Sequence, residues 1–301
     1  MSEASASLDD LRRQIDEIDR VLHDQLVRRC DLVLRIGALK DAVAKTPGSN
    51  RVHYRPAREA SMLRAMLQRH RGPLPKPSLV RIWQEIIAAS LQMEAPLTVA
   101  VHRPDAGSFG LWDLARINFG GITRFVPHET TQQVLGAVID GEASVGVLPL
   151  PEQGNAEQWW RRLMTTDRKV PRVVARLPFG ATGAEGMQAF VVAPIQPEPT
   201  GRDLSLIAIE TRGEVSRAGF ANAFRAENLE PVFLVSGLAS GEGDYLHLLE
   251  LPTFLSADDG RIARVAGTLE RELKQIWLLG CYAEPLNAAE LGLAGRTKGA
   301  I

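Results

Sequence analysis

The chain has 301 residues, of which 45% are hydrophobic and 24% are charged, and its formal net charge is −1. This near-neutral balance offers no basic footprint for nucleic acid or for an anionic membrane surface, and no apolar run approaches the roughly eighteen residues of a membrane-spanning helix. The first residues lack the basic and then apolar pattern of a secretory signal peptide. We therefore expect a cytoplasmic protein that binds neither nucleic acid nor membranes.

The length predicts two or three domains, because it exceeds what one small core accommodates. Two cysteines, Cys30 and Cys281, are present and lie far apart in the chain. They lack the spacing of metal ligands, so we expect a pair of reduced thiols and no metal site at these cysteines.

The N-terminal part is predicted to be all-helical. From Leu8 to Leu39 the apolar residues recur at helical spacing, which indicates one continuous amphipathic helix. Such a long helix cannot bury its apolar stripe alone, so it needs other helices or a second copy of the chain. Turn formers at 46–50 separate it from two further helices, expected at 56–70 and 78–93.

The character of the chain changes after Ala95, where a β-branched run at 97–101 is typical of a strand. Helix-like and strand-like segments then alternate to about Pro194, and a linker rich in proline and glycine follows. Beyond the linker we expect strands at 204–210, 232–236, 245–250 and 276–282 and helices at 216–228 and 258–275. This βαββαβ order is typical of a ferredoxin-like sandwich.

These patterns predict a multidomain protein. Its parts are an all-α three-helix domain at 1–95, an α/β domain at 97–194, a ferredoxin-like α+β domain at 202–286 and a flexible tail at 287–301.

Three basic residues of the first predicted helix, Arg12, Arg29 and Lys40, are candidates for binding an anion. Arg29 and Lys40 are about three turns apart and share one face of the helix. Arg12 and Arg29 are separated by roughly 25 Å along a helix axis, so one copy of the helix cannot bring both to a small molecule. A single arginine on a helix face is usually solvated, and only the pattern over the whole domain favours a site.

Five stretches of this domain resemble, in the right order, the helical class of chorismate mutases. They are Leu11-Arg12-Arg-Gln-Ile-Asp-Glu-Ile-Asp19, Val27-Arg28-Arg29-Cys-Asp-Leu32, Ile36-Gly37-Ala-Leu-Lys40, Arg55-Pro-Ala-Arg58-Glu59 and Ile86-Ile-Ala-Ala-Ser90-Leu-Gln-Met-Glu94. The resemblance implies an intertwined homodimer in which each site takes one arginine from the first helix of the partner. The implied catalytic residues are Lys40, Glu94 and Arg29, and the implied substrate-binding residues are Arg12, Arg29, Lys40, Arg58, Glu59, Ser90 and Glu94.

The implied reaction is the pericyclic rearrangement of chorismate to prephenate, which needs no nucleophile, metal or cofactor. A protein can add a compact pose and complementary charge where the ether bond breaks. The resemblance implies that Arg29 and Arg12 of the partner subunit hold the two carboxylates by paired hydrogen bonds. Arg58 lines the same cationic pocket, Ser90 assists with a carboxylate, and Lys40 donates to the ether oxygen.

Two positions depart from the family pattern. Glu94 stands where some members have glutamine, and it could donate to the ether oxygen only if protonated. We therefore expect activity to decline as the pH rises above neutral and Glu94→Gln to flatten this profile. Arg55 stands where an aspartate often binds the ring hydroxyl, so this contact is expected to rest mostly on Glu59.

Residues 97–194 resemble a shortened prephenate dehydratase, through the stretches 99–110 and 138–149. The catalytic signatures of that family are replaced, since Pro149-Leu-Pro-Glu-Gln153 stands for Glu-Asn-Ser and Met187-Gln-Ala-Phe190 for Thr-Arg-Phe. One lobe instead of two is also too small to enclose a substrate in a cleft. We expect this segment to be inactive.

Residues 204–285 resemble the ACT regulatory domain that follows dehydratases. Ile276-Trp-Leu-Leu-Gly-Cys-Tyr282 matches its final strand, and 213–219 lies where its first loop binds an amino acid. The Gly-Ala-Leu and Glu-Ser-Arg-Pro patterns of that site are missing, which favours a dimerising module without a ligand.

The sequence thus predicts a chorismate mutase of aromatic amino acid biosynthesis in the shikimate pathway, with a non-catalytic C-terminal part. Two alternatives stay open. One is a bifunctional chorismate mutase/prephenate dehydratase, and the other is a non-catalytic sensor of chorismate or an aromatic amino acid. The effector, if any, of the C-terminal domains is open as well.

Overall fold

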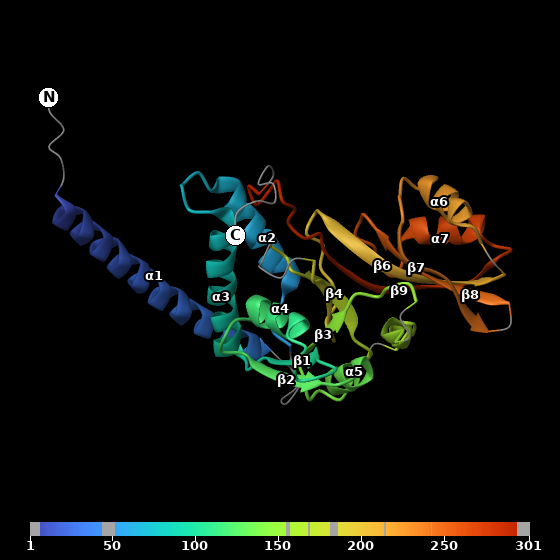
Figure 1. The fold of residues 1–301 in the computed structure, drawn as a ribbon, viewed down its shortest axis with the longest axis horizontal. Helices are drawn as coiled ribbons and strands as arrows, with labels where there is room; N and C mark the ends of the chain where they lie inside the picture. The colour runs from blue at the N-terminus through green and yellow to red at the C-terminus, as the bar shows by residue number, and fades with distance from the viewer. Residues whose placement is uncertain are drawn as a thin grey trace, which may run out of the picture.

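The computed structural model joins an N-terminal layer of helices to one long mixed β-sheet (Figure 1). The residues that it describes are 7–43, 52–154, 157–167, 169–180, 186–213, 215–241 and 243–293. Within these residues no helix combines the length and the apolar character needed to cross a membrane.

The three predicted N-terminal helices are present as α1 (Leu8–Val43), α2 (Pro56–Arg69) and α3 (Lys76–Glu94). The hydroxyl of Ser7 accepts a hydrogen bond from the Asp10 amide at 3.1 Å and donates to the Asp10 carboxylate at 2.6 Å. This exchange caps the first turn of α1, whose amide groups have no partner within the helix. α2 and α3 both carry a proline in the first two positions, where no backbone N–H is needed.

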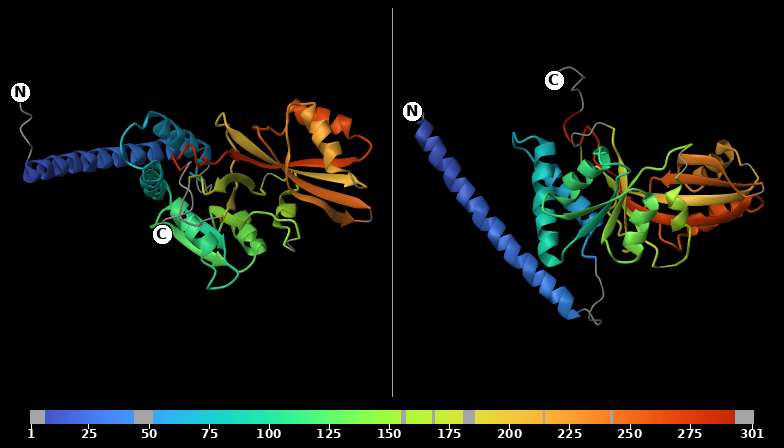
Figure 2. Two further views of the ribbon diagram at one scale, coloured as in Figure 1. Left: turned by 45° about the horizontal axis from the view of Figure 1, so that its top comes forward. Right: turned by 60° about the horizontal axis from the view of Figure 1, so that its bottom comes forward.

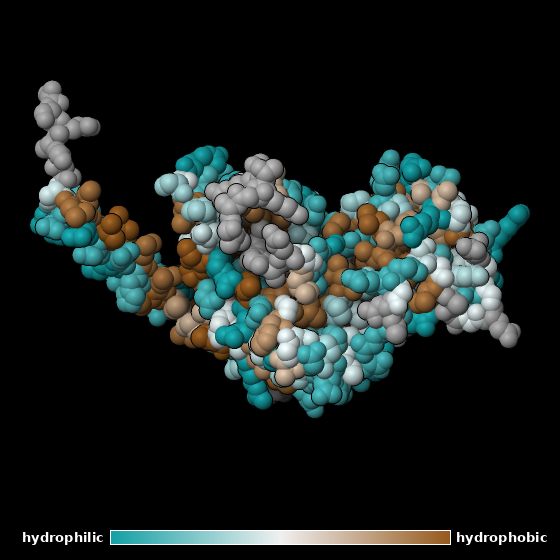
Figure 3. Space-filling view, viewed as in Figure 1, coloured by the Kyte–Doolittle hydropathy of each residue, from teal (hydrophilic) through white to brown (hydrophobic). Residues whose placement is uncertain are grey.

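α1 projects away from the rest of the molecule (Figures 1 and 2). Among its described residues only Val33 and Gly37 are buried, and both lie in the C-terminal half of α1, which contacts α3. The large apolar side chains that α1 exposes are Leu8, Leu11, Ile15, Ile18, Val21, Leu22, Leu26, Val27, Leu32, Leu34, Ile36 and Leu39. They form a hydrophobic band along the projecting helix in Figure 3, so the predicted stripe is not covered within one chain.

The α/β domain follows directly. Its elements are β1 (Thr98–His102), α4 (Gly110–Phe119), β2 (Arg124–His128), α5 (Thr131–Ile139), β3 (Val145–Pro149), the 3-10 helix η1 (Trp159–Leu163), β4 (Arg172–Leu177) and β5 (Ala189–Ala193). β1 lies between β2 and β3 and runs parallel to both, whereas β5 runs antiparallel to β3 and to β4. α4 packs on α3, which joins this domain to the helical layer.

The last domain has the predicted βαββαβ order. It consists of β6 (Asp203–Arg212), α6 (Arg217–Arg225), β7 (Val232–Gly241), β8 (Asp244–Leu251), α7 (Gly260–Thr268) and β9 (Leu273–Ala283). The strand order β9-β6-β8-β7 with antiparallel pairing confirms the ferredoxin-like arrangement. The helix predicted at 258–275 was too long, because Leu273–Gln275 pair with β6 instead and extend β9.

The two sheets meet edge to edge and form one nine-stranded sheet. β4 pairs with β9 in parallel through Val173 and Gly280. A Cβ atom at Gly280 would lie 2.0 Å from the carbonyl oxygen of Val173, so only glycine fits this junction.

The segment after β9 returns to the helical layer. Leu286 and Leu291 are 8% and 2% exposed and pack in one cluster with Leu63, Leu67 and Val80. Lys76 Nζ also donates to the Glu290 carbonyl at 2.8 Å. The prediction of a flexible tail is therefore wrong for 287–293, because these leucines find an apolar surface; residues 294–301 lie outside the described part.

Candidate active site

A cavity of about 320 Å³ lies among α1, the loop before α2, α2 and α3. Its lining residues are Arg29, Leu32, Val33, Ile36, Lys40, His53, Arg55, Arg58, Glu59, Met62, Ile87, Ser90, Leu91 and Glu94. Six of the seven predicted site residues are in this set, although they come from three helices. The apolar members are walls that exclude water, and the charged members sit around one space.

Arg29 and Ser90 are in direct contact across the cavity. Arg29 Nη1 donates to Ser90 Oγ, which in turn donates to the Ile86 carbonyl at 2.7 Å. Ser90 is 7% exposed, so it fixes the half-buried guanidinium against α3. The remaining N–H groups of this planar guanidinium can bind a carboxylate with two parallel hydrogen bonds.

Lys40 and Glu94 form an ion pair further along the same two helices, α1 and α3. Lys40 Nζ donates to Glu94 Oε2 at 2.5 Å, and His53 Nδ1 lies 3.2 Å from the same oxygen. The Glu94 side chain is 12% exposed and the Lys40 side chain 35%. An ammonium has three N–H groups, so Lys40 can keep Glu94 and still donate to a bound molecule.

Glu59 is the most strongly perturbed acid of the site. Its Oε1 is withdrawn from solvent and has no hydrogen-bond partner among the described residues. Burial raises the pKa of this carboxyl from 4.5 to about 8, because the charged form loses its hydration. At neutral pH Glu59 can therefore both donate a hydrogen bond and accept one, as recognition of a hydroxyl requires.

Arg12 is not brought to this cavity by its own chain. It lies on the exposed part of α1 and pairs with Asp9 at 3.4 Å. Its separation from Arg29 is roughly 25 Å by helix geometry, which agrees with the expectation that one copy of α1 cannot supply both arginines. Its contribution to a partner's site stays a prediction.

Sequence reasoning missed His53 and gave Arg55 no role. His53 lies in the loop before α2, and nothing in its local pattern places it beside Glu94, since the two are far apart in sequence. Arg55 lines the cavity, but its guanidinium donates to both oxygens of Glu198 at 2.7 and 2.9 Å. This ion pair with the interdomain linker is half exposed on both sides and contributes little stability.

The charges of the lining suit a small anion with two carboxylates. Arg29, Lys40, Arg55 and Arg58 supply four positive charges around one space, of which Lys40 is paired with Glu94 and Arg55 with Glu198. The described residues contain no group of three or more histidine, cysteine or acidic side chains placed to hold a metal ion. The arrangement can bind, orient and hydrogen-bond a ligand, and it offers donors at several fixed points.

Comparisons with known proteins agree with the resemblance of the helical domain. Residues 11–95 match the family model described as chorismate mutase type II. A bifunctional chorismate mutase/prephenate dehydratase of Stutzerimonas stutzeri is 31% identical over 150 residues, which is 50% of this chain and 40% of that protein. The corresponding protein of Neisseria gonorrhoeae is 36% identical over 109 residues, covering 35% of this chain and 28% of its own length.

The chain thus matches less than half the length of these curated relatives. Among solved structures, a prephenate dehydratase from Arthrobacter aurescens in complex with L-Phe aligns with 65% of this chain and 95% of its own, at 14% identity and a TM-score of 0.46.

Proposed function

We propose that this protein is a chorismate mutase, an intramolecular isomerase that converts chorismate to prephenate in aromatic amino acid biosynthesis. The observation that carries the proposal is the cavity itself. Arg29, Lys40, Arg58, Glu59, Ser90 and Glu94 line one space, within the domain that matches the chorismate mutase type II model. Chorismate carries two carboxylates, a ring hydroxyl and an ether oxygen, and the cavity offers a group of suitable chemistry for each.

The proposed mechanism uses binding and charge alone. Arg29, positioned by Ser90, binds one carboxylate, and Arg58 adds positive charge to the same pocket. Lys40 donates a free N–H to the ether oxygen as negative charge develops during C–O cleavage. Holding the substrate in a compact pose removes much of the entropic barrier, and the fixed donors stabilise the transition state more than the ground state.

Glu59 is proposed to bind the ring hydroxyl. The buried carboxyl has an oxygen free of partners among the described residues and lies on the cavity wall. A substrate hydroxyl can donate to one oxygen of this carboxyl and accept from it when it is protonated, so the buried group gains hydrogen bonds when the substrate binds. Arg55, held by Glu198, does not replace this function in the geometry observed.

We also propose that the active form is a homodimer in which Arg12 of the partner subunit completes each site. The support is the apolar stripe that α1 exposes along its length. Burial of one exposed leucine or isoleucine contributes about 1.5–3 kcal/mol, so a second copy packed on this stripe would stabilise the long helix substantially. A cytoplasmic location stays part of this proposal.

The C-terminal two domains are proposed to be non-catalytic and to serve regulation or dimerisation. A second candidate is a bifunctional mutase–dehydratase, which the similarity to bifunctional relatives favours. Against it stand Met187-Gln-Ala-Phe190 and Pro149-Leu-Pro-Glu-Gln153 in place of the dehydratase signatures. A non-catalytic sensor is the third candidate. Lys40, the proposed donor to the ether oxygen, argues against it, because a protein that only binds chorismate does not need this donor.

One assay separates the three functions. Purified full-length protein is given chorismate, its absorbance is followed, and the product is tested for prephenate and phenylpyruvate. Loss of chorismate with accumulation of prephenate supports the mutase with an inactive α/β domain. Formation of phenylpyruvate supports the bifunctional enzyme, and a folded protein that binds chorismate without turnover would contradict the mutase function.

A further inference from the structure

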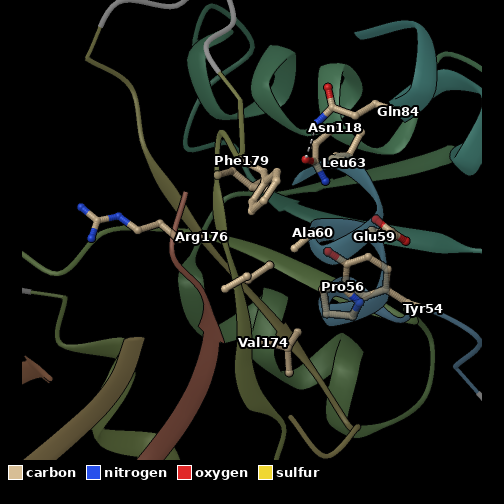
Figure 4. Close-up of a pocket in the computed structure, with 13 residues that line it drawn as sticks. Tyr54, Pro56, Glu59, Ala60, Leu63, Gln84, Asn118, Val174, Arg176 and Phe179 are labelled. Atoms are coloured by element: carbon tan, nitrogen blue, oxygen red, sulfur yellow. Dashed lines mark hydrogen bonds between the residues drawn. The ribbon is translucent and has the colours of Figure 1, made fainter. Parts of the chain in front are cut away.

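Glu59 also lines a second, much smaller cavity of about 30 Å³, where the helical domain meets the α/β domain (Figure 4). The wall comes from the loop before α2, from α2 and α3, from α4 and from β4. A space of this size holds about one water molecule, and a buried water needs two to four polar partners. Among the described residues, Glu59 is thus the one that lines both the active-site cavity and this interdomain cavity.

Three uncharged polar side chains line the small cavity in addition to Glu59. Gln84 Nε2 donates to Asn118 Oδ1 at 3.3 Å, and the Asn118 side chain also interacts with the Tyr54 hydroxyl. In Figure 4 the Asn118 amide lies between Gln84 and the Tyr54 hydroxyl. Tyr54 and Gln84 belong to the helical domain, whereas Asn118 is on α4. One amide of the α/β domain therefore organises two side chains behind the mutase site.

Two oxygens at this cavity lack hydrogen-bond partners among the described residues, Glu59 Oε1 and Gln84 Oε1. Gln84 is only 6% exposed and Tyr54 only 2%. Buried polar atoms are nearly always paired with protein or with an ordered water. A single water in the cavity can bond Glu59 Oε1 and has the Tyr54 hydroxyl and the Asn118 amide as further partners.

We propose that Asn118 is a positioning residue of the mutase site: it holds Gln84 and Tyr54 around a one-water site that fixes the Glu59 carboxyl for the substrate hydroxyl. The inference rests on the proposed mutase function. It gives the α/β domain a part in the mutase reaction, even though the dehydratase signatures are replaced in that domain.

Charged groups face Glu59 mainly from the other side. Around the active-site cavity they are Arg29 and Lys40 on α1, His53 and Arg55 in the loop before α2, Arg58 on α2 and Glu94 on α3. On the interdomain side, Arg176 is the one charged residue besides Glu59 among the described residues of the wall. Its guanidinium turns away (Figure 4) and pairs with Glu250 at 2.8 and 2.9 Å. The uncharged network thus dominates the solvation of Glu59 from this side.

The test reads the titration of Glu59 in the full-length protein, through its stability to urea between about pH 5 and pH 10. Asn118→Leu removes the hydrogen bond to Gln84 and the amide beside the Tyr54 hydroxyl, and it makes this part of the cavity wall apolar, so the ionised carboxyl loses solvation. We expect the titration midpoint to move upward by about one pH unit. The limb of kcat/KM for chorismate that depends on Glu59 should move by the same amount, and Glu59→Gln should abolish both.

Gln92→Leu is the matched control. Gln92 Nε2 also bonds across the domain boundary, to Thr123 Oγ1 at 3.1 Å, yet Gln92 lines neither cavity. We expect a loss of stability that is the same at every pH, with no shift of the midpoint. Tyr54→Phe, which removes a single hydroxyl, should shift the midpoint in the same direction by less, and serves if Asn118→Leu does not fold.

An unmoved midpoint in Asn118→Leu or Tyr54→Phe, or an equal shift in Gln92→Leu, would overturn the role of Asn118. Absence of chorismate turnover in the wild-type protein would instead contradict the proposed function. The two failures are therefore distinguishable, because the urea titration needs no substrate.

Discussion

The two sides of the helical domain differ in how much of their surface is covered by the rest of the same chain. α2 and α3 are sealed by the C-terminal segment and by α4, with Leu63, Leu67 and Val80 nearly inaccessible. α1 leaves its apolar stripe in solvent and carries Arg12 far from the cavity. One chain thus holds the residues around Lys40 and Glu59 in place, whereas in the proposed dimer the remaining part of the site comes from a second copy.

The largest loss of activity is expected for Lys40→Ala, in the part of the site that one chain supplies. Loss of the donor to the ether oxygen should lower kcat for chorismate by about a thousandfold, while binding of a dianionic ligand through the arginines persists. Lys76→Ala is a matched control, since Lys76 bonds the Glu290 carbonyl outside the cavity. Equal kcat values for Lys40→Ala and Lys76→Ala would remove Lys40 from the mechanism.

The uncovered half is tested by Leu22→Asp on the exposed stripe of α1. The two copies of Leu22 in a symmetric dimer should together lose about 3 kcal/mol, which is roughly a hundredfold in the dimer dissociation constant. Sedimentation at several concentrations measures this constant, and activity at low concentration should fall in parallel.

Leu74→Asp is the control for the stripe, because Leu74 is 42% exposed, against 56% for Leu22, but lies outside α1. The dimer should be unaffected by it. Dissociation caused equally by both substitutions would contradict an interface built on α1.

The buried carboxyl of Glu59 makes the stability of the folded protein depend on pH. The folded protein keeps a proton on this carboxyl up to about pH 8, whereas the unfolded chain releases it near pH 4.5. Between these values the folded state binds more protons, so stability falls as the pH rises, by about 2 kcal/mol from pH 5.5 to pH 7. Urea unfolding should show this fall in the wild type and not in Glu59→Gln.

Glu198→Gln is the comparison for that measurement. It removes an exposed carboxylate that pairs with Arg55 beside the cavity, and it should leave the fall in stability unchanged. If Glu59→Gln showed the same slope as the wild type, the buried carboxyl would not be the titrating group.

The smallest expected effect concerns Glu94. The expectation that this side chain donates to the ether oxygen predicts a kcat that declines above neutral pH, by up to about tenfold per pH unit, whereas in the structure its Oε2 accepts from Lys40 at 2.5 Å. Glu94→Gln supplies an amide donor at every pH and should flatten the profile. Glu59→Gln, measured in the same series, separates the two carboxyls, and a profile that Glu94→Gln leaves unchanged would exclude this role.

Much of the fold was readable from local patterns. The recurrence from Leu8 to Leu39 predicted α1, and the run at 97–101 predicted β1, because periodicity reflects which face meets a core. The boundary between α7 and β9 was misplaced, since pairing of Leu273–Gln275 with β6 overrode helical propensity. The order of residues 287–293 depended on a surface formed by Leu63 and Val80, which no local pattern reveals.

Site residues that follow the pattern of the family could be predicted from the sequence. Contacts that depend on tertiary packing could not. Arg29, Lys40, Glu59 and Ser90 fall in register across the helices of the resemblance, and the fold brings them to one cavity. The contact of His53 with Glu94 and the placement of Asn118 behind Glu59 join residues far apart in sequence. Only the packing of the α/β domain against α3 makes the second of these visible.

The most direct test of an active site shared between two chains mixes two variants that are each expected to be inactive, Arg12→Ala and Arg29→Ala. In a heterodimer one site keeps both arginines, Arg29 of one protomer and Arg12 of its partner, and the other site loses both. Random exchange of subunits should therefore restore about a quarter of wild-type chorismate turnover, measured as prephenate formed. Activity that stays at the level of the separate variants after demonstrated subunit exchange would contradict a chorismate mutase site shared between two chains.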